Sequence, residues 1–159
     1  MTEINGLNLW KDQMKLPNKN EPCPHCGRFL NRGISIDCLI IKDGKILLGK
    51  RKHDPFGGYW GIFGGYVEWD ESPEDAVIRE LKEETNLNVR DMKLFVVYGN
   101  PGRHEKQVIT IVYVVEVEGN PTPDDDIIEI KWFDLKEIPK LAFDHNIIIK
   151  DYLRKFKSG

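Results

Sequence analysis

The sequence predicts an α/β fold in which a mixed β-sheet is packed between helices. Six runs of mainly apolar, β-branched or aromatic residues have the length and composition of strands. Two further segments, residues 73–85 and 147–156, have the apolar spacing of amphipathic helices. Strands with only a few intervening helices are typical of a sheet that helices cover.

The length of 159 residues fits one domain with its own hydrophobic core. We find no internal repeat and no linker that would divide this domain. Residues 1–32 begin without a sustained period and continue with a Cys-Pro-His-Cys-Gly stretch. We therefore expect an N-terminal arm with a compact knuckle over residues 1–32, and the folded domain over residues 33–159.

The composition is that of an ordinary globular protein, with 40% hydrophobic residues, 31% charged residues and a formal net charge of −3. This balance gives no long-range attraction to nucleic acid or to an anionic membrane. No run approaches the roughly 18 apolar residues of a membrane span, and the N-terminus is too polar for a signal peptide. We predict a cytoplasmic location. An anionic substrate would have to be held by local features, namely metal ions, a few basic side chains and backbone N–H groups.

The strands follow from apolar runs that turn residues separate. Asp43-Gly44 lies between the first two runs and is a strong hairpin signal. A loop with Pro55 and several glycines precedes the third run, which contains the pair Gly64-Gly65. The expected strands comprise residues 34–41, 46–50, 61–67, 93–98, 108–118 and 128–133.

The helix over residues 73–85 has clear signals at its start. Ser72 is a favourable N-cap, Pro73 stands at the first helical position, and Asp75 completes a capping box with Ser72. At about 100° per residue, this helix has separate apolar and acidic arcs. The apolar arc, which we expect to pack on the sheet, contains Val77, Ile78 and Leu81.

The acidic arc contains Glu80, Glu83 and Glu84, which fall within about 100° of one another around the helix. Like charges at these spacings repel each other, and a divalent cation would convert that repulsion into ligation. Carboxylate oxygens suit Mg²⁺ or Mn²⁺. The alternative is a solvated acidic face, as most charged helix faces are. The preceding Gly-Gly pair and Arg79, within reach of Glu83, favour the metal site.

The segment from Gly65 to Leu87 resembles the Nudix box, the signature of the Nudix hydrolase family. The box is a Gly, five residues, a Glu, seven residues, and then Arg-Glu-apolar-x-Glu-Glu-x-Gly-apolar. Asn86 departs from it, but Asn tolerates the left-handed conformation of a helix end better than any residue except Gly. The resemblance covers residues 34–153 and implies a Nudix-type α/β/α sandwich. The matching residues are Gly65, Glu71, Arg79, Glu80, Leu81, Glu83, Glu84 and Leu87.

The resemblance also implies roles for these residues. In the family, box glutamates hold divalent ions, Mg²⁺ or Mn²⁺, that bridge a diphosphate and activate water. Carried over to this chain, the metal ligands would be Glu80, Glu83, Glu84 and the carbonyl oxygen of Gly65. Glu83 and Glu84 would form the central pair, Arg79 would orient a box glutamate, and Glu71 would support the loop or the metal site.

The general base is not fixed by the resemblance, because family members place it variably. It is either Glu84 itself or an acid of a later loop. The run of three aspartates in that loop also suits a merely solvated turn. The later candidates are Asp124, Asp125, Asp126 and Glu129.

Substrate selection must come from residues outside the box, because substrates of many kinds share it. Residues 98–103 are similar to a proline-containing segment of ADP-ribose pyrophosphatases, which favours an ADP-ribose-like substrate. Arg51 and Arg103 are candidates for phosphate binding, and His104 is a candidate substrate-loop residue. The candidates for stacking on a base are Tyr59, Trp60 and Tyr98, and Trp60 equally suits the core.

Two alternatives to an ADP-ribose hydrolase stay open. One is a pyrophosphohydrolase of ordinary or oxidised nucleoside triphosphates. The other is a catalytically silent nucleotide-sensing domain, although the presence of every box carboxylate favours an enzyme. The weakly acidic composition argues against an RNA partner, and a homodimer is left open.

The N-terminal knuckle contains Cys23 and Cys26, whose spacing matches half of a zinc ribbon. It is similar to part of the ribbon that precedes the catalytic domain of NADH pyrophosphatases, but a second Cys-x-x-C pair is absent. Zinc would need ligands from a second subunit, because a structural zinc site normally has four. Otherwise packing alone holds the knuckle. Cys38 lies in an apolar run and is expected to be buried.

Overall fold

The computed structural model describes residues 21–24 and 26–157. The chain divides into two compact units, residues 1–32 and residues 33–159. In the described part of the first unit, two hydrogen bonds close a turn at the knuckle. The amide of Cys23 donates to the carbonyl of Arg28 at 2.7 Å, and that of Gly27 donates to the carbonyl of Cys23 at 2.8 Å. Gly27 has a φ of +71°, in the left-handed region that glycine adopts without strain.

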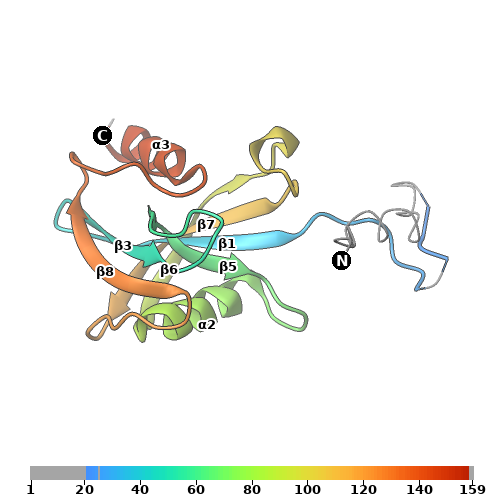
Figure 1. Cartoon of the computed structure of the whole chain (residues 1–159), viewed down its shortest axis with the longest axis horizontal. Helices are drawn as coiled ribbons and strands as arrows, with labels where there is room; N and C mark the ends of the chain where they lie inside the picture. Colours follow the sequence, from blue (N-terminus) through green and yellow to red (C-terminus); the bar gives the residue numbers. More distant parts are fainter. Residues whose placement is uncertain (1–20, 25, 158–159) are drawn as a thin grey trace, which may run out of the picture. The chain divides into compact units, whose positions relative to one another are not determined.

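A mixed sheet of four strands lies in the second unit, in the order β5-β1-β7-β6 among the described residues (Figure 1). Its strand β1 (Ile34–Leu39) pairs antiparallel with β5 (Phe63–Tyr66) and parallel with β7 (Ile109–Glu118). At the far side, β6 (Asn88–Tyr98) pairs antiparallel with β7. The parallel pair among antiparallel neighbours confirms the predicted mixed sheet.

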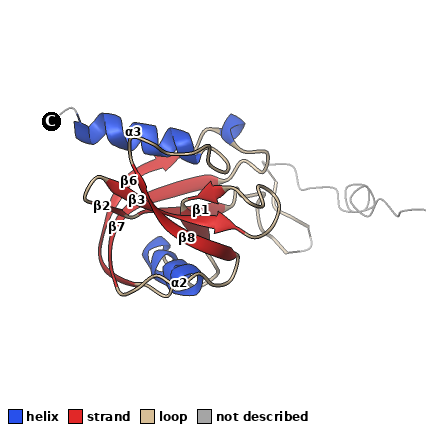
Figure 2. Ribbon diagram, turned by 60° about the vertical axis from the view of Figure 1, so that its left-hand side comes forward, coloured by secondary structure: helices blue, strands red, loops and turns tan. Residues whose placement is uncertain are grey.

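A second sheet is built around β3 (Lys45–Arg51) (Figure 2). The strands β2 (Ile41–Lys42), β4 (Trp60–Gly61) and β8 (Ile127–Asp134) all pair antiparallel with β3. The predicted Asp-Gly turn joins β2 to β3, so the hairpin expected at the start of the domain is present.

The helices α2 (Pro73–Thr85) and α3 (His145–Lys157) cover opposite sides of these strands (Figures 1 and 2). The second unit has two clusters of buried apolar residues among those described, and β1 contributes side chains to both. Ile36 and Cys38 pack in the cluster that contains the apolar side chains of α2, whereas Leu39 packs with those of α3. This arrangement confirms the α/β/α sandwich, and Cys38 is fully buried as expected.

The helix α2 begins and ends where the sequence predicts. Ser72 and Asp75 form the capping box, and Asn86 has a φ of +59° at the C-terminal end. The expectation that Ile78 packs on the sheet was wrong, because its side chain is 50% exposed. The helix is instead rotated so that Glu84 faces inward. Ala76, Val77 and Leu81 form the apolar face that packs in the core, and Ile78 lies beside this face.

Several other boundaries differ from the expected ones. The predicted strand over residues 61–67 is divided at Ile62, whose amide donates to His145 Nδ1 at 3.0 Å instead of to a neighbouring strand. The strand β6 begins five residues earlier than expected, and a short 3₁₀ helix, η1 (Pro101–Arg103), follows it. Among the described residues, no helix has the length and apolar character needed to cross a bilayer.

Candidate active site

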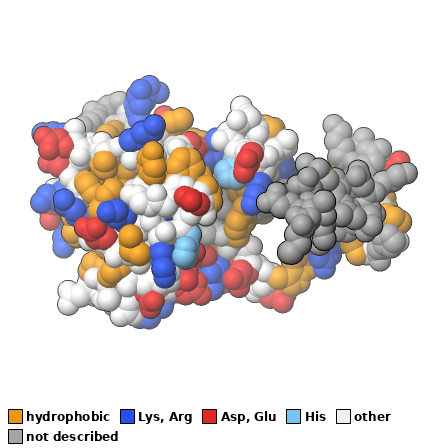
Figure 3. Space-filling model, viewed as in Figure 1, with side chains coloured by type: hydrophobic (Ala, Val, Ile, Leu, Met, Phe, Trp, Pro, Cys, Tyr) orange, Lys and Arg blue, Asp and Glu red, His pale blue; other side chains and the backbone are white. Residues whose placement is uncertain are grey.

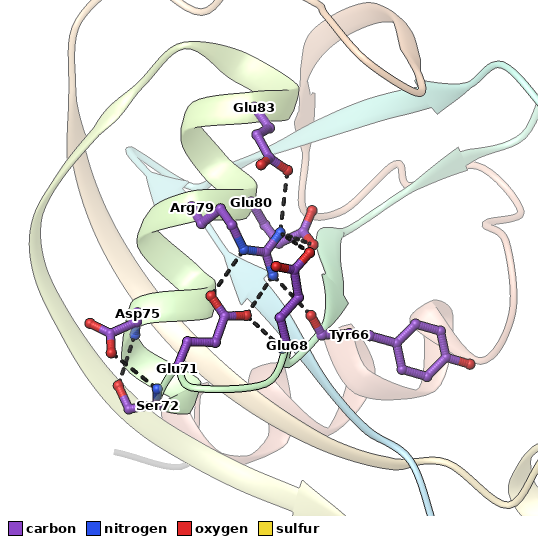
Figure 4. Close-up of polar contacts among 8 residues, drawn as sticks. All are labelled: Tyr66, Glu68, Glu71, Ser72, Asp75, Arg79, Glu80 and Glu83. Atoms are coloured by element: carbon purple, nitrogen blue, oxygen red, sulfur yellow. Dashed lines mark hydrogen bonds and ion pairs between the residues drawn. The ribbon is translucent and has the colours of Figure 1, made fainter.

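The guanidinium group of Arg79, on α2, joins the helix to the loop that precedes it (Figure 4). It makes two hydrogen bonds to Glu71, from Nε at 3.0 Å and from Nη2 at 2.6 Å. Nη2 also donates to the carbonyl oxygen of Tyr66 at 2.9 Å. Nη1 donates to Glu80 at 2.8 Å and to Glu83 at 3.3 Å. One planar cation therefore positions three carboxylates and the backbone of the loop.

The loop between β5 and α2 is held mainly through Glu71. Besides its contacts with Arg79, Glu71 Oε1 accepts a hydrogen bond from the amide of Glu68 at 2.7 Å. The hydrogen bonds from Arg79, followed by that from Glu68, lower the pKa of Glu71 to about 2. Glu71 is therefore ionised at neutral pH and anchors the guanidinium group.

Glu84 lies on the buried side of α2, where its negative charge is disfavoured. The residue is 7% exposed, and its carboxylate accepts a hydrogen bond from the amide of Gly64 at 3.2 Å. Burial raises the pKa of Glu84 well above its ordinary value, and the charges of Glu80 and Asp125 raise it further. Burial also raises the pKa of Glu80, against the opposing effect of Arg79. A cation at this place would stabilise both carboxylates.

The glycine pair of β5 lets the backbone lie against the acidic face of α2. A Cβ atom added at Gly64 would collide with the carbonyl oxygen of Ile36, and one added at Gly65 would collide with the carboxylate of Glu80. The absence of a side chain is therefore a steric requirement at Gly64, and at Gly65 it leaves room for the carboxylate of Glu80.

The acidic loop after β7 is attached to the end of α2. The amide of Asp124 donates to the carbonyl of Glu84 at 3.1 Å. Asp125 follows with a φ of +54°, which is uncommon for residues other than glycine. The charge of Asp125 raises the pKa of both Glu80 and Glu84. Asp125 is therefore the acid of this loop whose charge affects the pKa of the glutamates. The sequence alone did not distinguish it from Asp124 and Asp126.

The residues of the acidic cluster fit a divalent cation by their chemistry. Their donors are hard carboxylate oxygens, and negative charge is concentrated where burial already disfavours it. As the side chains lie, no group of three His, Cys, Asp or Glu among the described residues is arranged to hold a metal ion. Arg79 explains this, because its Nη1 engages Glu80 and Glu83 while Glu84 bonds to Gly64.

Of the two arginines predicted to bind phosphate, Arg51 at the end of β3 is the one whose charge affects a residue of the acidic cluster. Its Nε donates to the carbonyl of Pro55 at 3.0 Å, and its guanidinium group lies 4.9 Å from the ring centroid of Phe143. Its positive charge lowers the pKa of Glu84. Within the described part of the chain, its Nη atoms form no hydrogen bond and are available to an anionic ligand.

Arg103, the second predicted phosphate ligand, lies in an internal ion pair instead. Its Nη1 contacts both carboxylate oxygens of Asp144, at 3.0 and 2.8 Å. Its Nη2 donates to Thr110 Oγ1 at 2.5 Å and to the carbonyl of Val108 at 3.2 Å. The side chain is only 13% exposed, so this geometry supports a role in holding the loop before α3 rather than in binding phosphate.

Two of the predicted stacking residues are engaged in the core. Trp60 packs edge-on against Phe133, with ring centroids 4.9 Å apart, and belongs to the α3-side core. The hydroxyl of Tyr98 donates to Asp151 at 2.8 Å. Both rings are partly buried and pack against the α3-side core, which favours a packing role for them.

The third predicted stacking residue, Tyr59, belongs to a group of aromatic residues near Arg51. Tyr59 is 39% exposed and packs edge-on against Phe56, which in turn contacts Phe143. Sequence reasoning missed Phe56 and Phe143. Their only signal was an aromatic residue within a loop, which by itself does not distinguish a ligand contact from packing.

Asp37 and His145 form a buried pair on the α3 side of the sheet, with His145 Nε2 and Asp37 Oδ2 3.7 Å apart. Because His145 Nδ1 accepts a hydrogen bond from Ile62, the proton of the neutral ring lies on Nε2 and faces Asp37. Burial lowers the pKa of His145 to about 4. Burial, and then the charge of Asp144, raise the pKa of Asp37 to about 7, against the effect of Arg103.

At the N-terminal knuckle, Cys23 and Cys26 are not joined in a disulfide. His25 lies outside the described residues. The described residues provide no third side chain that would complete a zinc site with these cysteines, so the prediction of zinc gains no support.

Comparison with known proteins places these features in a family. The sequence model of the NUDIX domain matches residues 31–156. The chain is 47% identical to an ADP-ribose pyrophosphatase of Methanocaldococcus jannaschii over 99% of this chain and 94% of that protein. It is 33% identical to an oxidized purine nucleoside triphosphate hydrolase of Danio rerio, over 64% of this chain and 65% of that protein.

Solved structures show the same fold. The NUDIX domain of Shewanella oneidensis NrtR, complexed with ADP ribose, is 25% identical and has a TM-score of 0.72, covering 98% of this chain and 99% of that chain. A bifunctional NMN adenylyltransferase/ADP ribose pyrophosphatase of Francisella tularensis, complexed with AMP and a Mn ion, is 28% identical with a TM-score of 0.69. That match covers 96% of this chain and 46% of the longer protein.

The raised pKa of Asp37 predicts how stability depends on pH. The folded state holds this proton up to about pH 7 and the unfolded state only to about 3.8, so the contribution of Asp37 to stability is lost as the pH rises between these values. Asp37→Asn removes this loss. Its free energy of unfolding, relative to the original protein, should rise by about 3 kcal/mol from pH 5 to pH 8 in urea titrations. The exposed Asp91→Asn serves as the control, and a pH-independent difference for Asp37→Asn would contradict the assignment.

Proposed function

The chain belongs to the Nudix family, and on this premise we propose that it is a divalent-cation-dependent pyrophosphohydrolase that cleaves the diphosphate of ADP-ribose or a closely similar nucleotide. The observation that carries the proposal is the cluster of Glu80, Glu83 and Glu84 around Arg79, against the glycine backbone of β5. The chain is 47% identical to an ADP-ribose pyrophosphatase over nearly the full length of both proteins, which favours this substrate over nucleoside triphosphates.

Mg²⁺ or Mn²⁺ would be held by Glu80, Glu83 and Glu84, with the carbonyl oxygen of Gly65 as a further ligand. A bound ion of this kind neutralises the diphosphate and lowers the pKa of a coordinated water. Glu80 and Glu83 must then turn away from Arg79 Nη1. Glu83 is the more weakly held, at 3.3 Å, and is nearly half exposed. Glu71 keeps Arg79 in place through its 2.6 Å contact while these carboxylates move.

The substrate anion has to be attracted locally. Acidic and basic side chains are interspersed on the face shown in Figure 3, in agreement with a net charge of only −3. Arg51 supplies a positive charge that already acts on Glu84, and its Nη atoms form a planar fork suited to phosphate oxygens. In the proposed mechanism, Arg51 binds the diphosphate beside the acidic cluster.

Asp125 is the residue that we assign as general base. It accepts the proton of the attacking water, while Glu84 stays bonded to the Gly64 amide. The attachment of its loop to the end of α2, together with the effect of its charge on Glu80 and Glu84, supports this assignment. Asp126 is directed elsewhere, with Oδ1 3.7 Å from His53 Nε2.

Three further expectations stay predictions: a cytoplasmic location, a homodimer, and zinc at Cys23 and Cys26.

The proposed function predicts that the purified protein with Mg²⁺ converts ADP-ribose to AMP and ribose 5-phosphate. The double variant Glu83→Gln, Glu84→Gln should lose more than about 100-fold in rate, because even outer-shell partners of a metal site commonly contribute 10- to 100-fold. Chromatography of the products is the measurement, with NADH, diadenosine polyphosphates, dNTPs and oxidised dGTP run in parallel.

The matched control is Glu116→Gln, Glu118→Gln, which removes the same two charges from exposed positions of β7. Cleavage confined to triphosphates would contradict the substrate and keep the reaction. Tight nucleotide binding without any cleavage would contradict the enzyme and favour a sensing domain.

The assignment of Asp125 predicts that Asp125→Asn lowers kcat by about 100-fold or more, while KM changes little. The change removes a proton acceptor and keeps the size of the side chain. Asp124→Asn and Asp126→Asn are matched controls from the same loop and should retain most of the activity. A large loss in either control, with Asp125→Asn active, would transfer the role to that neighbour.

A further inference from the structure

The loop before α3 holds Phe143 in a fixed position. On one side of it, the amide of Ala142 donates to the carbonyl of Trp60 at 2.8 Å. On the other side, His145 accepts the hydrogen bond of Ile62 at 3.0 Å. The backbone of Phe143 has a φ of +52°, which is an outlier for a bulky residue. Such conformations persist only when the surroundings enforce them, and they occur preferentially at ligand sites.

A second aromatic residue in the same unusual conformation faces Phe143. Phe56 has a φ of +64°, and its ring centroid lies 4.8 Å from that of Phe143. The ring of His104 is nearly parallel to Phe143, at an interplanar angle of 29° and a centroid distance of 6.2 Å. We call Phe143, Phe56 and His104 the aromatic slot. Among the described residues, neither of the two hydrophobic cores includes any of them.

The aromatic slot adjoins the acidic cluster through Arg51. The guanidinium group lies 4.9 Å from the Phe143 centroid, and the amide of Arg51 donates to the carbonyl of Tyr59 at 2.9 Å. The end of β3 is also joined to the acidic loop, because the amide of Lys52 donates to the carbonyl of Asp126 at 2.8 Å. A ligand with its diphosphate at the acidic cluster would therefore place the adjoining group beside Arg51 and over the slot.

The chemistry of the slot selects a flat, aromatic group. Ring faces offer dispersion and π contacts but no hydrogen bonds, so they suit a nucleobase better than a ribose with its hydroxyl groups. A base held between two parallel rings needs about 7 Å between them, two contact distances. The centroids of His104 and Phe143 are 6.2 Å apart and the rings are tilted by 29°, so His104 has to move outward when a base enters between them. His104 lies on the partly exposed turn after η1.

We propose that the aromatic slot is the base-binding subsite, in which a purine stacks between Phe143 and His104 while Arg51 binds the adjoining phosphate. This inference rests on the proposed function, since it assigns the adenosine half of the substrate to one side of the acidic cluster. Phe56 supports the Phe143 ring from its edge. The subsite also gives His104 a place in substrate binding, while Trp60 and Tyr98 contribute to the core.

The test measures AMP and ribose 5-phosphate, the two halves of the cleaved substrate, as ligands of the full chain by calorimetry. Phe143→Ala and His104→Ala should each weaken AMP binding by about 10-fold or more, the loss expected for one stacked base. Binding of ribose 5-phosphate should stay unchanged. Phe143→Tyr and His104→Phe should restore the affinity for AMP, because each keeps an aromatic face. Phe156→Ala, which removes an exposed phenyl ring from α3, is the matched control and should bind AMP normally.

Equal weakening of both ligands, or none of either, would overturn the subsite. If Phe143→Ala does not fold, His104→Ala decides, because its ring lies on a partly exposed turn. The outcome is separable from that of the proposed function. ADP-ribose cleavage with AMP binding insensitive to both rings would leave the activity and remove the subsite. Ring-dependent AMP binding without cleavage would leave the subsite and remove the activity.

Discussion

The contacts of Arg79 are the constraint on which the rest of the site depends. Four glutamates and a glycine-rich strand come together here, and like charges at this spacing repel one another. The fork of one guanidinium group offsets that repulsion by bonding to Glu71, Glu80 and Glu83 and to the carbonyl of Tyr66. The loop is thereby fixed to α2. The buried Glu84 is then placed against the Gly64 amide, where its charge calls for a cation.

Cleavage and recognition are assigned to different parts of this arrangement. The acids that would hold the cation lie on one helix, α2, and on the loop attached to its end. The groups assigned to the base and to its phosphate, Phe143, His104 and Arg51, lie on loops and strand ends on the side of α3. Such a division allows the box to be kept while the loops change, which is how one fold serves many substrates. Arg103 contributes to recognition only indirectly. Its ion pair with Asp144 holds the loop that carries Phe143.

What the sequence predicted correctly depends on short-range rules. The capping box of Ser72 and Asp75 and the left-handed Asn86 are properties of one helix and its ends, and both are observed. The residues whose burial or role the sequence did not predict depend on contacts between distant segments. Ile78 is exposed because Ala76, Val77 and Leu81 form the face of α2 that packs in the core, with Glu84 buried beside them against the Gly64 amide. The ion pair of Arg103 with Asp144, and the choice of Asp125 among three aspartates, arise from loops that meet only in the folded chain.

The most direct test of the account is a titration with Mn²⁺, followed by electron paramagnetic resonance, of the original protein and Arg79→Lys. Lysine keeps the positive charge but cannot form the guanidinium fork, so the comparison isolates geometry from charge. Because Glu80 and Glu83 leave Arg79 Nη1 when they hold the ion, the contribution of Arg79 to metal affinity lies in its contacts with Glu71 and the carbonyl of Tyr66, which fix the loop beside Gly65. If these contacts position the site, the original protein binds Mn²⁺, Mg²⁺ displaces it, and Arg79→Lys binds it about 10- to 100-fold more weakly. Equal Mn²⁺ affinity in the two proteins would show that the acidic cluster forms without the fork and would contradict the account.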